Sequence, residues 1–154
     1  MADYFFDTSA LVKAYVPEVG MEWVRSLLDP DAHNDIFIVR LATVEMTSAI
    51  VRRQRSGSLT ADAVQAALSE FRTQLESDLF IAEVTDTLVS QAIQLVERRG
   101  LRAYDALQLS AAVDLRRRAA TFGLSPPIFV SADSELNAAA LSEGLVVENP
   151  LSHP

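Results

Sequence analysis

The chain contains no cysteine and only two histidines among its 154 residues. Without thiols it cannot form disulfides, zinc–thiolate sites or a cysteine nucleophile. His33 lies in a polar linker and His153 is the penultimate residue, so neither is placed for a Ser–His–Asp triad. If the protein is an enzyme, its polar chemistry must come mostly from carboxylates, hydroxyls and arginines.

Long apolar runs are also missing. No stretch of about 18 apolar residues occurs, which argues against a membrane span. The first residues lack the basic and apolar segments of a secretory signal peptide. Nearly half of the residues are hydrophobic and the length suits one core. We therefore expect a single domain at residues 1–150, a short tail at 151–154 and a cytoplasmic location.

Positive charge is scarce as well. The formal net charge is −8, and of the 13 basic residues all but Lys13 are arginine. Such an acidic chain is unusual for a nucleic-acid-binding protein, because these proteins normally present basic surfaces. Two bound divalent cations would halve the charge, and arginine can grip a phosphate with two hydrogen bonds. Arginines on solvated helix faces would explain the same composition.

Apolar segments alternate with amphipathic ones along the chain. The short apolar runs predict buried strands at residues 4–6, 36–39, 79–84, 128–130 and 145–147. The segments between them have helical spacing and predict helices at 8–15, 18–28, 41–56, 61–77, 86–99, 104–122 and 133–141. This alternation is typical of an α/β fold, a three-layer sandwich around a mainly parallel sheet of four to five strands.

Two aspartates follow predicted strands. Asp7 comes directly after the first strand, and Asp133 comes shortly after the fourth. In open parallel sheets, ligands bind outside the carboxyl ends of the strands, where the strand order reverses. Both residues are therefore candidates for that crevice. Each is also a favoured residue for capping the helix that follows it, and the sequence leaves both interpretations open.

Two further acids, Glu45 and Asp105, lie on apolar helix faces. Their neighbours one helical turn away are leucine, isoleucine and alanine side chains. An ionised carboxylate is costly to bury without a partner, so both positions indicate a functional role. A buried salt bridge to an arginine would also explain Glu45, and a favourable interaction with the helix dipole would explain Asp105.

Four carboxylates gathered in one site would repel one another unless they were protonated or bound a cation. Hard divalent cations prefer oxygen ligands, and Mg²⁺ keeps several of its waters. Such an ion can make water a better nucleophile and offset charge on a phosphoryl oxygen. The set Asp7, Glu45, Asp105 and Asp133 therefore predicts a Mg²⁺ or Mn²⁺ site suited to phosphodiester hydrolysis.

Hydroxyl and guanidinium groups lie beside these acids. Thr8 and Ser131 are candidates for orienting a carboxylate, whereas Ser9 and Ser134 are interpreted more simply as turn or cap residues. Two arginines share helices with the acids and are candidates for contacting phosphate, namely Arg52 and Arg102.

Five segments carry a pattern of their own: residues 4–11 (Tyr-Phe-Phe-Asp-Thr-Ser-Ala-Leu), the helix around Glu45, and residues 102–109, 130–136 and 144–147. In these segments the chain resembles the PIN domain family, and within it the VapC-type ribonuclease toxins. The resemblance spans nearly the whole chain, with the four acids in order and no departure at their positions. The acidic net charge is the feature that fits an RNA-cutting enzyme least comfortably.

This resemblance implies a parallel sheet whose carboxyl edge gathers the acids. It implies a metal-dependent endoribonuclease, the toxin of a toxin–antitoxin pair, in which Asp7, Glu45, Asp105 and Asp133 bind Mg²⁺ or Mn²⁺. It also implies homodimerisation and neutralisation by a cognate antitoxin, whose tail typically enters the acidic cleft.

Other functions remain as alternatives. A haloacid-dehalogenase-like phosphatase would place a second Asp at position 9, where this chain has Ser9, and a phospho-receiver domain would need a lysine partner that is not evident. A PIN-like fold could also act as a protein-interaction module that binds an antitoxin with little turnover. Within the nuclease interpretation, nothing in the sequence distinguishes RNA from DNA as the substrate.

Overall fold

The computed structural model describes residues 2–154, and a sheet of five strands lies at its centre. The strand order is β3-β2-β1-β4-β5, and every pairing in it is parallel. The strands are β1 (Asp3–Phe6), β2 (Asp35–Val39), β3 (Leu79–Ala82), β4 (Ile128–Val130) and β5 (Val146–Glu148). The predicted α/β fold is confirmed, and the sheet is parallel throughout.

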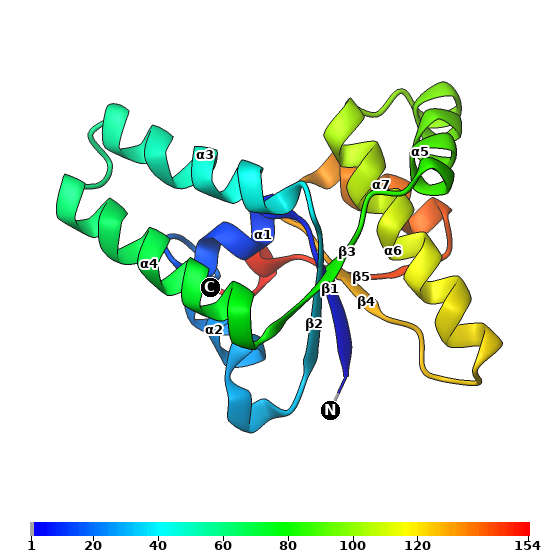
Figure 1. Ribbon diagram of the computed structural model, residues 1–154, viewed down its shortest axis with the longest axis horizontal. Helices are drawn as coiled ribbons and strands as arrows, with labels where there is room; N and C mark the ends of the chain where they lie inside the picture. Colours follow the sequence, from blue (N-terminus) through cyan, green and yellow to red (C-terminus); the bar gives the residue numbers. More distant parts are fainter. Residues whose placement is uncertain (1) are drawn as a thin grey trace.

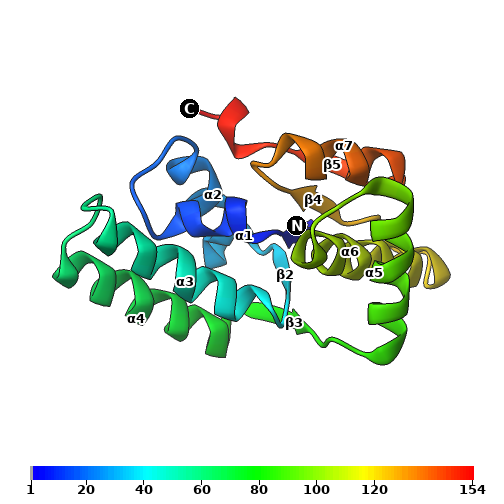
Figure 2. The same ribbon diagram turned by 90° about the horizontal axis from the view of Figure 1, so that it is seen from above.

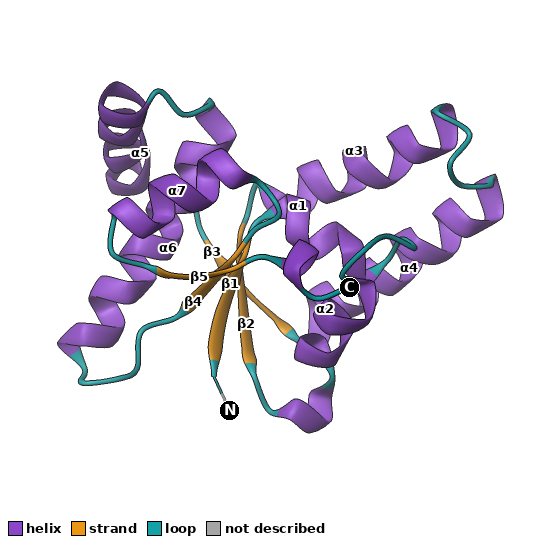
Figure 3. Cartoon of the chain, turned by 180° about the vertical axis from the view of Figure 1, so that it is seen from behind, coloured by secondary structure: helices purple, strands orange, loops and turns teal. Residues whose placement is uncertain are grey.

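Helices lie on both sides of this sheet. Figures 1 and 2 show α1 to α4 on one side and α5 to α7 on the other. The helices are α1 (Thr8–Leu11), α2 (Met21–Leu28), α3 (Ala42–Arg55), α4 (Ala61–Ser77), α5 (Asp86–Arg99), α6 (Ala103–Thr121) and α7 (Ser134–Ser142). Seen from behind in Figure 3, the hairpin of α3 and α4 extends away from the sheet. Within residues 2–154, no helix combines the length and the apolar character needed to cross a membrane.

The central strand β1 explains why the sequence begins with a continuous apolar run. Phe5 and Phe6 are fully buried, and Phe5 stacks on Phe129 of β4 with ring centroids 6.1 Å apart. A strand covered on both faces needs apolar side chains at successive positions. The strand order reverses between β1 and β4, since β2 and β3 continue on one side and β4 and β5 on the other. A ligand crevice is therefore expected outside the carboxyl ends of β1 and β4.

Three predicted elements differ from the structure by more than one residue at a boundary or in type. The helix predicted at 8–15 consists of α1 followed by a 3-10 helix, η1 (Val12–Ala14). The helix predicted from residue 18 begins only at Met21, because Gly20 precedes it in the left-handed conformation with a φ of 88°. The third strand was predicted to reach residue 84, but β3 ends at Ala82.

The C-terminal residues, predicted as a tail, pack against α2. After β5 they form a 3-10 helix, η3 (Pro150–Ser152), in which Pro150 is buried. His153 stacks on Trp23 of α2 with ring centroids 4.1 Å apart. A side chain at Gly20 would place its Cβ 2.5 Å from the Pro150 carbonyl oxygen, so glycine permits this close approach.

Candidate metal centre at the carboxyl edge of the sheet

The four predicted acids all lie at helix N-termini. Asp7 is the N-cap of α1 and Asp133 is the N-cap of α7. Glu45 lies in the first turn of α3, and Asp105 lies in the first turn of α6. Negative charge is stabilised near a helix N-terminus by the helix dipole, which is one reason why the fold tolerates these acids.

Asp7 follows β1 and is almost fully buried, with 3% of its surface exposed. Its Oδ1 accepts a hydrogen bond from the backbone N of Ala10 at 3.1 Å. Ser9 Oγ donates to the same carboxylate, at 2.8 Å from Oδ1 and 3.0 Å from Oδ2. Burial raises the pKa of Asp7 to about 7, against the opposing effect of these hydrogen bonds. Asp7 is thus a helix cap, and it is also a buried acid that a cation would help to ionise.

Ser9 and Ser131 connect the ends of β1 and β4. Ser9 Oγ accepts a hydrogen bond from the backbone N of Ala132 at 2.9 Å and lies 3.4 Å from Ser131 Oγ. Ser131 Oγ in turn accepts from the backbone N of Asp133 at 3.0 Å. Sequence reasoning preferred a turn or cap role for Ser9 over the orientation of a carboxylate, whereas the structure shows that Ser9 donates to Asp7. The available signal was its position two residues after an aspartate that directly follows a strand.

Asp133 is held through one of its two carboxylate oxygens. Its Oδ1 accepts a hydrogen bond from the backbone N of Leu136 at 2.9 Å. Its other oxygen, Oδ2, accepts no hydrogen bond from residues 2–154. The cap therefore fixes the side chain while leaving one oxygen free. Ser134, the next residue, is exposed on α7.

Glu45 is half-buried and is held by two neutral donors. Its Oε2 accepts hydrogen bonds from Thr8 Oγ1 at 2.7 Å and from Gln108 Nε2 at 2.6 Å. The buried salt bridge considered for Glu45 does not form, since no cationic nitrogen of residues 2–154 lies within 4.0 Å of its carboxylate. Burial raises the pKa of Glu45, Thr8 lowers it, and the charge of Asp105 raises it further.

Asp105 experiences the charges of its acidic neighbours. Its pKa is raised first by burial and then by the charge of Asp133, while Arg102 lowers it and Glu135 raises it. Asp105 therefore links electrostatically to Glu45 on one side and to Asp133 on the other. Glu135 is an additional acid that sequence reasoning missed, although its place in the first turn of α7, two residues after Asp133, was a signal.

The two arginines predicted to contact phosphate have different surroundings. Arg102 is the exposed N-cap residue of α6 and is close enough to lower the pKa of Asp105. Arg52 is exposed on α3, and its guanidinium makes no hydrogen bond or ion pair within residues 2–154. The structure therefore brings Arg102 near the acids and shows no contact between them and Arg52.

The donor chemistry fits a hydrated divalent cation better than a closed metal cage. Over residues 2–154, no three His, Asp or Glu side chains are arranged so that they could hold a metal ion between them. The acids offer only oxygen ligands, and Glu45 and Asp133 each keep one carboxylate oxygen free of hydrogen bonds from the described residues. Mg²⁺ is commonly bound through one or two carboxylates while water fills its other positions. Such an ion fits the all-oxygen donor set of these side chains.

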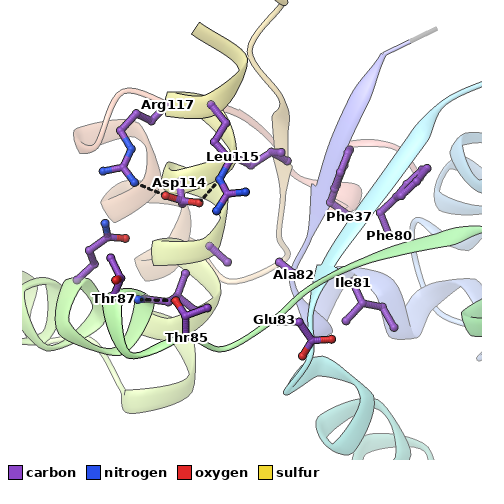
Figure 4. A pocket seen from close by; sticks show the side chains of 14 residues that line it. Phe37, Phe80, Ile81, Ala82, Glu83, Thr85, Thr87, Asp114, Leu115 and Arg117 are labelled. Carbon is purple, nitrogen blue, oxygen red and sulfur yellow. Dashed lines mark hydrogen bonds and ion pairs between the residues drawn. The ribbon is translucent and has the colours of Figure 1, made fainter. Parts of the chain in front are cut away.

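A separate groove of about 670 Å³ lies between the β2–β3 part of the sheet and helices α5 and α6, as Figure 4 shows. Phe37 and Phe80 stack on one wall with centroids 5.1 Å apart, and Asp114 is held by Arg117 and Arg118 on the other. None of the four predicted acids lines this groove. It is therefore distinct from the candidate metal centre.

Several solved structures share this fold. PAE2754 from Pyrobaculum aerophilum is 19% identical with a TM-score of 0.62, and the alignment covers 99% of this chain and 85% of that chain. VapBC2 from Rickettsia felis, bound to a DNA fragment from their promoter, is 20% identical with a TM-score of 0.59, covering 96% and 98%. No curated protein sequence matches the chain significantly. The family model described as the PIN domain matches residues 4–140, and the chain therefore belongs to the PIN domain family.

Proposed function

We propose that this protein is a metal-dependent endoribonuclease, the toxin of a toxin–antitoxin pair, that hydrolyses RNA phosphodiester bonds. PIN domains are generally nucleases, which makes hydrolysis of nucleic acid the expected chemistry. One observation carries the proposal further. The acids Asp7, Glu45, Asp105 and Asp133 all lie at helix N-termini, and none has a cationic side chain within 4.0 Å in residues 2–154.

The four acids would hold Mg²⁺ or Mn²⁺, which supplies positive charge against a phosphoryl oxygen and makes water more acidic. Each side chain of the site has its own task in this proposal. Thr8 orients Glu45, while Ser9 and Ser131 keep the ends of β1 and β4 together. Arg102 remains a candidate for binding phosphate beside Asp105, because its guanidinium is exposed and close. Arg52 remains a weaker candidate on α3.

The proposal includes a cognate antitoxin, a homodimer and a cytoplasmic location. The likeness to VapBC2 is a likeness of fold, and it supports the antitoxin as a hypothesis. Exposed apolar side chains at Val89, Ile93 and Val96 follow one another at helical spacing along α5. In this proposal they would contact another chain, because exposed apolar side chains that lie together are candidates for an interaction surface.

A second candidate function is a catalytically weak PIN-like module that binds an antitoxin. Two observations favour it: the net charge of −8, and the lack of three preassembled acidic ligands among residues 2–154. The two functions differ in turnover, because only a nuclease loses activity when a single acid is replaced.

The test is cleavage of a mixed-sequence single-stranded RNA by purified protein. Reactions contain Mg²⁺, Mn²⁺ or EDTA, and DNA of the same sequence is run in parallel. The proposal expects RNA cleavage that requires metal and that Asp105→Asn abolishes. Metal-independent cleavage, or equal cleavage by Asp105→Asn, would contradict it. Absence of cleavage together with antitoxin binding would favour the interaction module.

A further inference from the structure

Gln108 is a buried polar residue next to the candidate metal centre that the family resemblance does not assign. Only 2% of its surface is exposed, and it lies on α6 one helical turn after Asp105. We propose that Gln108 is a positioning residue that fixes Glu45 through Oε2 and leaves its other oxygen available to the cation. This inference rests on the proposed metal-dependent function.

The hydrogen bonds determine which way the Gln108 amide faces. The backbone N–H of Thr8 can only donate, and it points at Gln108 Oε1 over 3.1 Å. The Nε2 group must therefore face the opposite side, where it donates to Glu45 Oε2 at 2.6 Å. Thr8 Oγ1 donates to the same oxygen at 2.7 Å. Both donors thus converge on Glu45 Oε2, and Glu45 Oε1 accepts no hydrogen bond from residues 2–154.

The chemistry of an amide suits this task. An arginine or lysine at position 108 would also fix Glu45, but its charge would neutralise the carboxylate and compete with a metal cation. A neutral amide orients the carboxylate and leaves its negative charge in place. Metal-binding side chains are commonly held by such outer hydrogen bonds, and losing one typically weakens metal binding by about 10- to 100-fold.

Gln108 also connects three parts of the site. Its own helix, α6, carries Asp105 on the same face, because residues three apart are neighbours on a helix. Its Oε1 accepts a hydrogen bond from the backbone N of Thr8, which follows Asp7. Its Nε2 donates a hydrogen bond to Glu45 on α3. One side chain therefore sets the relative position of the elements that carry three of the four acids.

The experiment measures Mn²⁺ affinity of the full chain by isothermal titration calorimetry. Gln108→Met removes the donor and the acceptor with little change in volume. We expect it to weaken Mn²⁺ binding by about 10- to 100-fold relative to the native protein. The matched control is Gln91→Met, since Gln91 on α5 also accepts a hydrogen bond, from Ser110, outside the metal centre. The control is expected to retain native affinity.

A double-mutant cycle separates positioning from a purely structural role. In a Glu45→Gln background, Gln108→Met is expected to change Mn²⁺ affinity by less than about twofold, because the carboxylate that Gln108 orients is already gone. A purely structural role would lower the melting temperature and leave the affinity of the folded protein unchanged. If the native protein and Gln108→Met bind Mn²⁺ with equal affinity, the inference about Gln108 is wrong but the metal proposal stands. Native protein that binds no Mn²⁺ would overturn the metal proposal as well.

A second measurement needs no variant at position 108. In the native protein, titration with Mg²⁺ is expected to shift the side-chain NH₂ signals of Gln108 and the backbone amide signal of Thr8 in ¹⁵N–¹H spectra. The Gln91 side-chain signals serve as the internal reference and are expected to stay in place. Unchanged Gln108 signals at a Mg²⁺ concentration that saturates the protein would contradict the proposal.

Discussion

Glu45 and Glu143 are both half-buried, yet their surroundings act on them in opposite directions. Burial alone would raise the pKa of Glu143, but Arg99 and Arg98 donate to it at 3.0 and 3.2 Å and lower its pKa overall. Glu45 has only neutral donors, and its pKa is raised. Burial raises the pKa of both acids, and the presence or absence of an arginine partner decides the direction of the overall pKa shift.

The same contrast extends across the molecule. Glu18 is held by Lys13 and Arg53, and Asp114 is held by Arg117 and Arg118. The acids at the carboxyl edge of the sheet have no such partners among residues 2–154. An acid whose charge is already balanced inside the protein has little to gain from a metal ion. The unbalanced acids are therefore the ones expected to bind a cation from solution.

The largest expected effect is on cleavage by Glu45→Gln. We expect about a 1000-fold loss of RNA cleavage rate, because the variant removes a ligand that contributes several kcal/mol of charge stabilisation. The control is Glu143→Gln, which changes a partly buried acid that arginines already balance. Steady-state cleavage assays compare the two. Equal activity of both variants would contradict the claim that the acids without arginine partners are the functional ones.

The next effect is on stability, through the buried Asp7. Its pKa is raised from 3.8 to about 7 in the folded protein, mainly by burial. The contribution of Asp7 to the free energy of unfolding is therefore fully present below about pH 4, where the carboxyl group is protonated in both states. It is lost as the pH rises through about 7. The side chain of Asp7→Asn cannot ionise. In EDTA, the free energy of unfolding of this variant should therefore exceed that of the native protein by near zero at pH 4 and by at most about 4 kcal/mol at pH 8. Urea unfolding across this pH range measures it, and a variant less stable than the native protein at pH 8 would refute the interpretation.

Divalent cations should stabilise the native protein. At a Mg²⁺ concentration about 100 times Kd, binding contributes about 2.7 kcal/mol, which corresponds to about 5–10 °C in melting temperature for a chain of this size. Asp133→Asn should show a smaller increase, because it removes one ligand. Melting curves with Mg²⁺ and with EDTA provide the measurement. Identical curves for the native protein in both solutions would count against a metal centre.

The smallest effect is expected at the balanced acids. Glu143→Gln loses its contacts with Arg98 and Arg99, whose side chains are about half and one-third exposed. Ion pairs with such exposed partners contribute at most about 1 kcal/mol. The free energy of unfolding from urea titration should therefore change little, with no effect on Mg²⁺ stabilisation. Loss of Mg²⁺ stabilisation in this variant would show that the division between the two groups of acids is wrong.

Much of the fold could be predicted from the sequence because strands and helices carry different patterns. The apolar run before Asp7 predicted a buried strand, and the structure places it at the centre of the sheet. The ends of helices and strands were harder to predict where the backbone conformation of one residue decides them. Gly20 has a left-handed backbone conformation, and α2 begins only after it, at Met21. Gly20 also packs against Pro150, which is far away in the sequence.

The site could be predicted only in part. Glu45 and Asp105 stood out because a charged side chain is unexpected on an apolar helix face. Gln108 lies on the same helix as Asp105, but a glutamine there gives no local signal until its hydrogen bonds to Glu45 and Thr8 are seen. Ser9 and Glu135 did carry local signals, since each lies two residues after an aspartate of the site. Their interactions with other strands and helices could not be predicted from the sequence.

The most direct test of the central claim compares two aspartates of the same helix. Asp105 and Asp114 both lie on α6 and are both half-buried, but only Asp114 is held by arginines. RNA cleavage in Mg²⁺ is measured for Asp105→Asn and Asp114→Asn beside the native protein. We predict that Asp105→Asn loses metal-dependent cleavage and that Asp114→Asn retains it. Retention of full activity by Asp105→Asn, or loss of activity in both variants, would contradict the account.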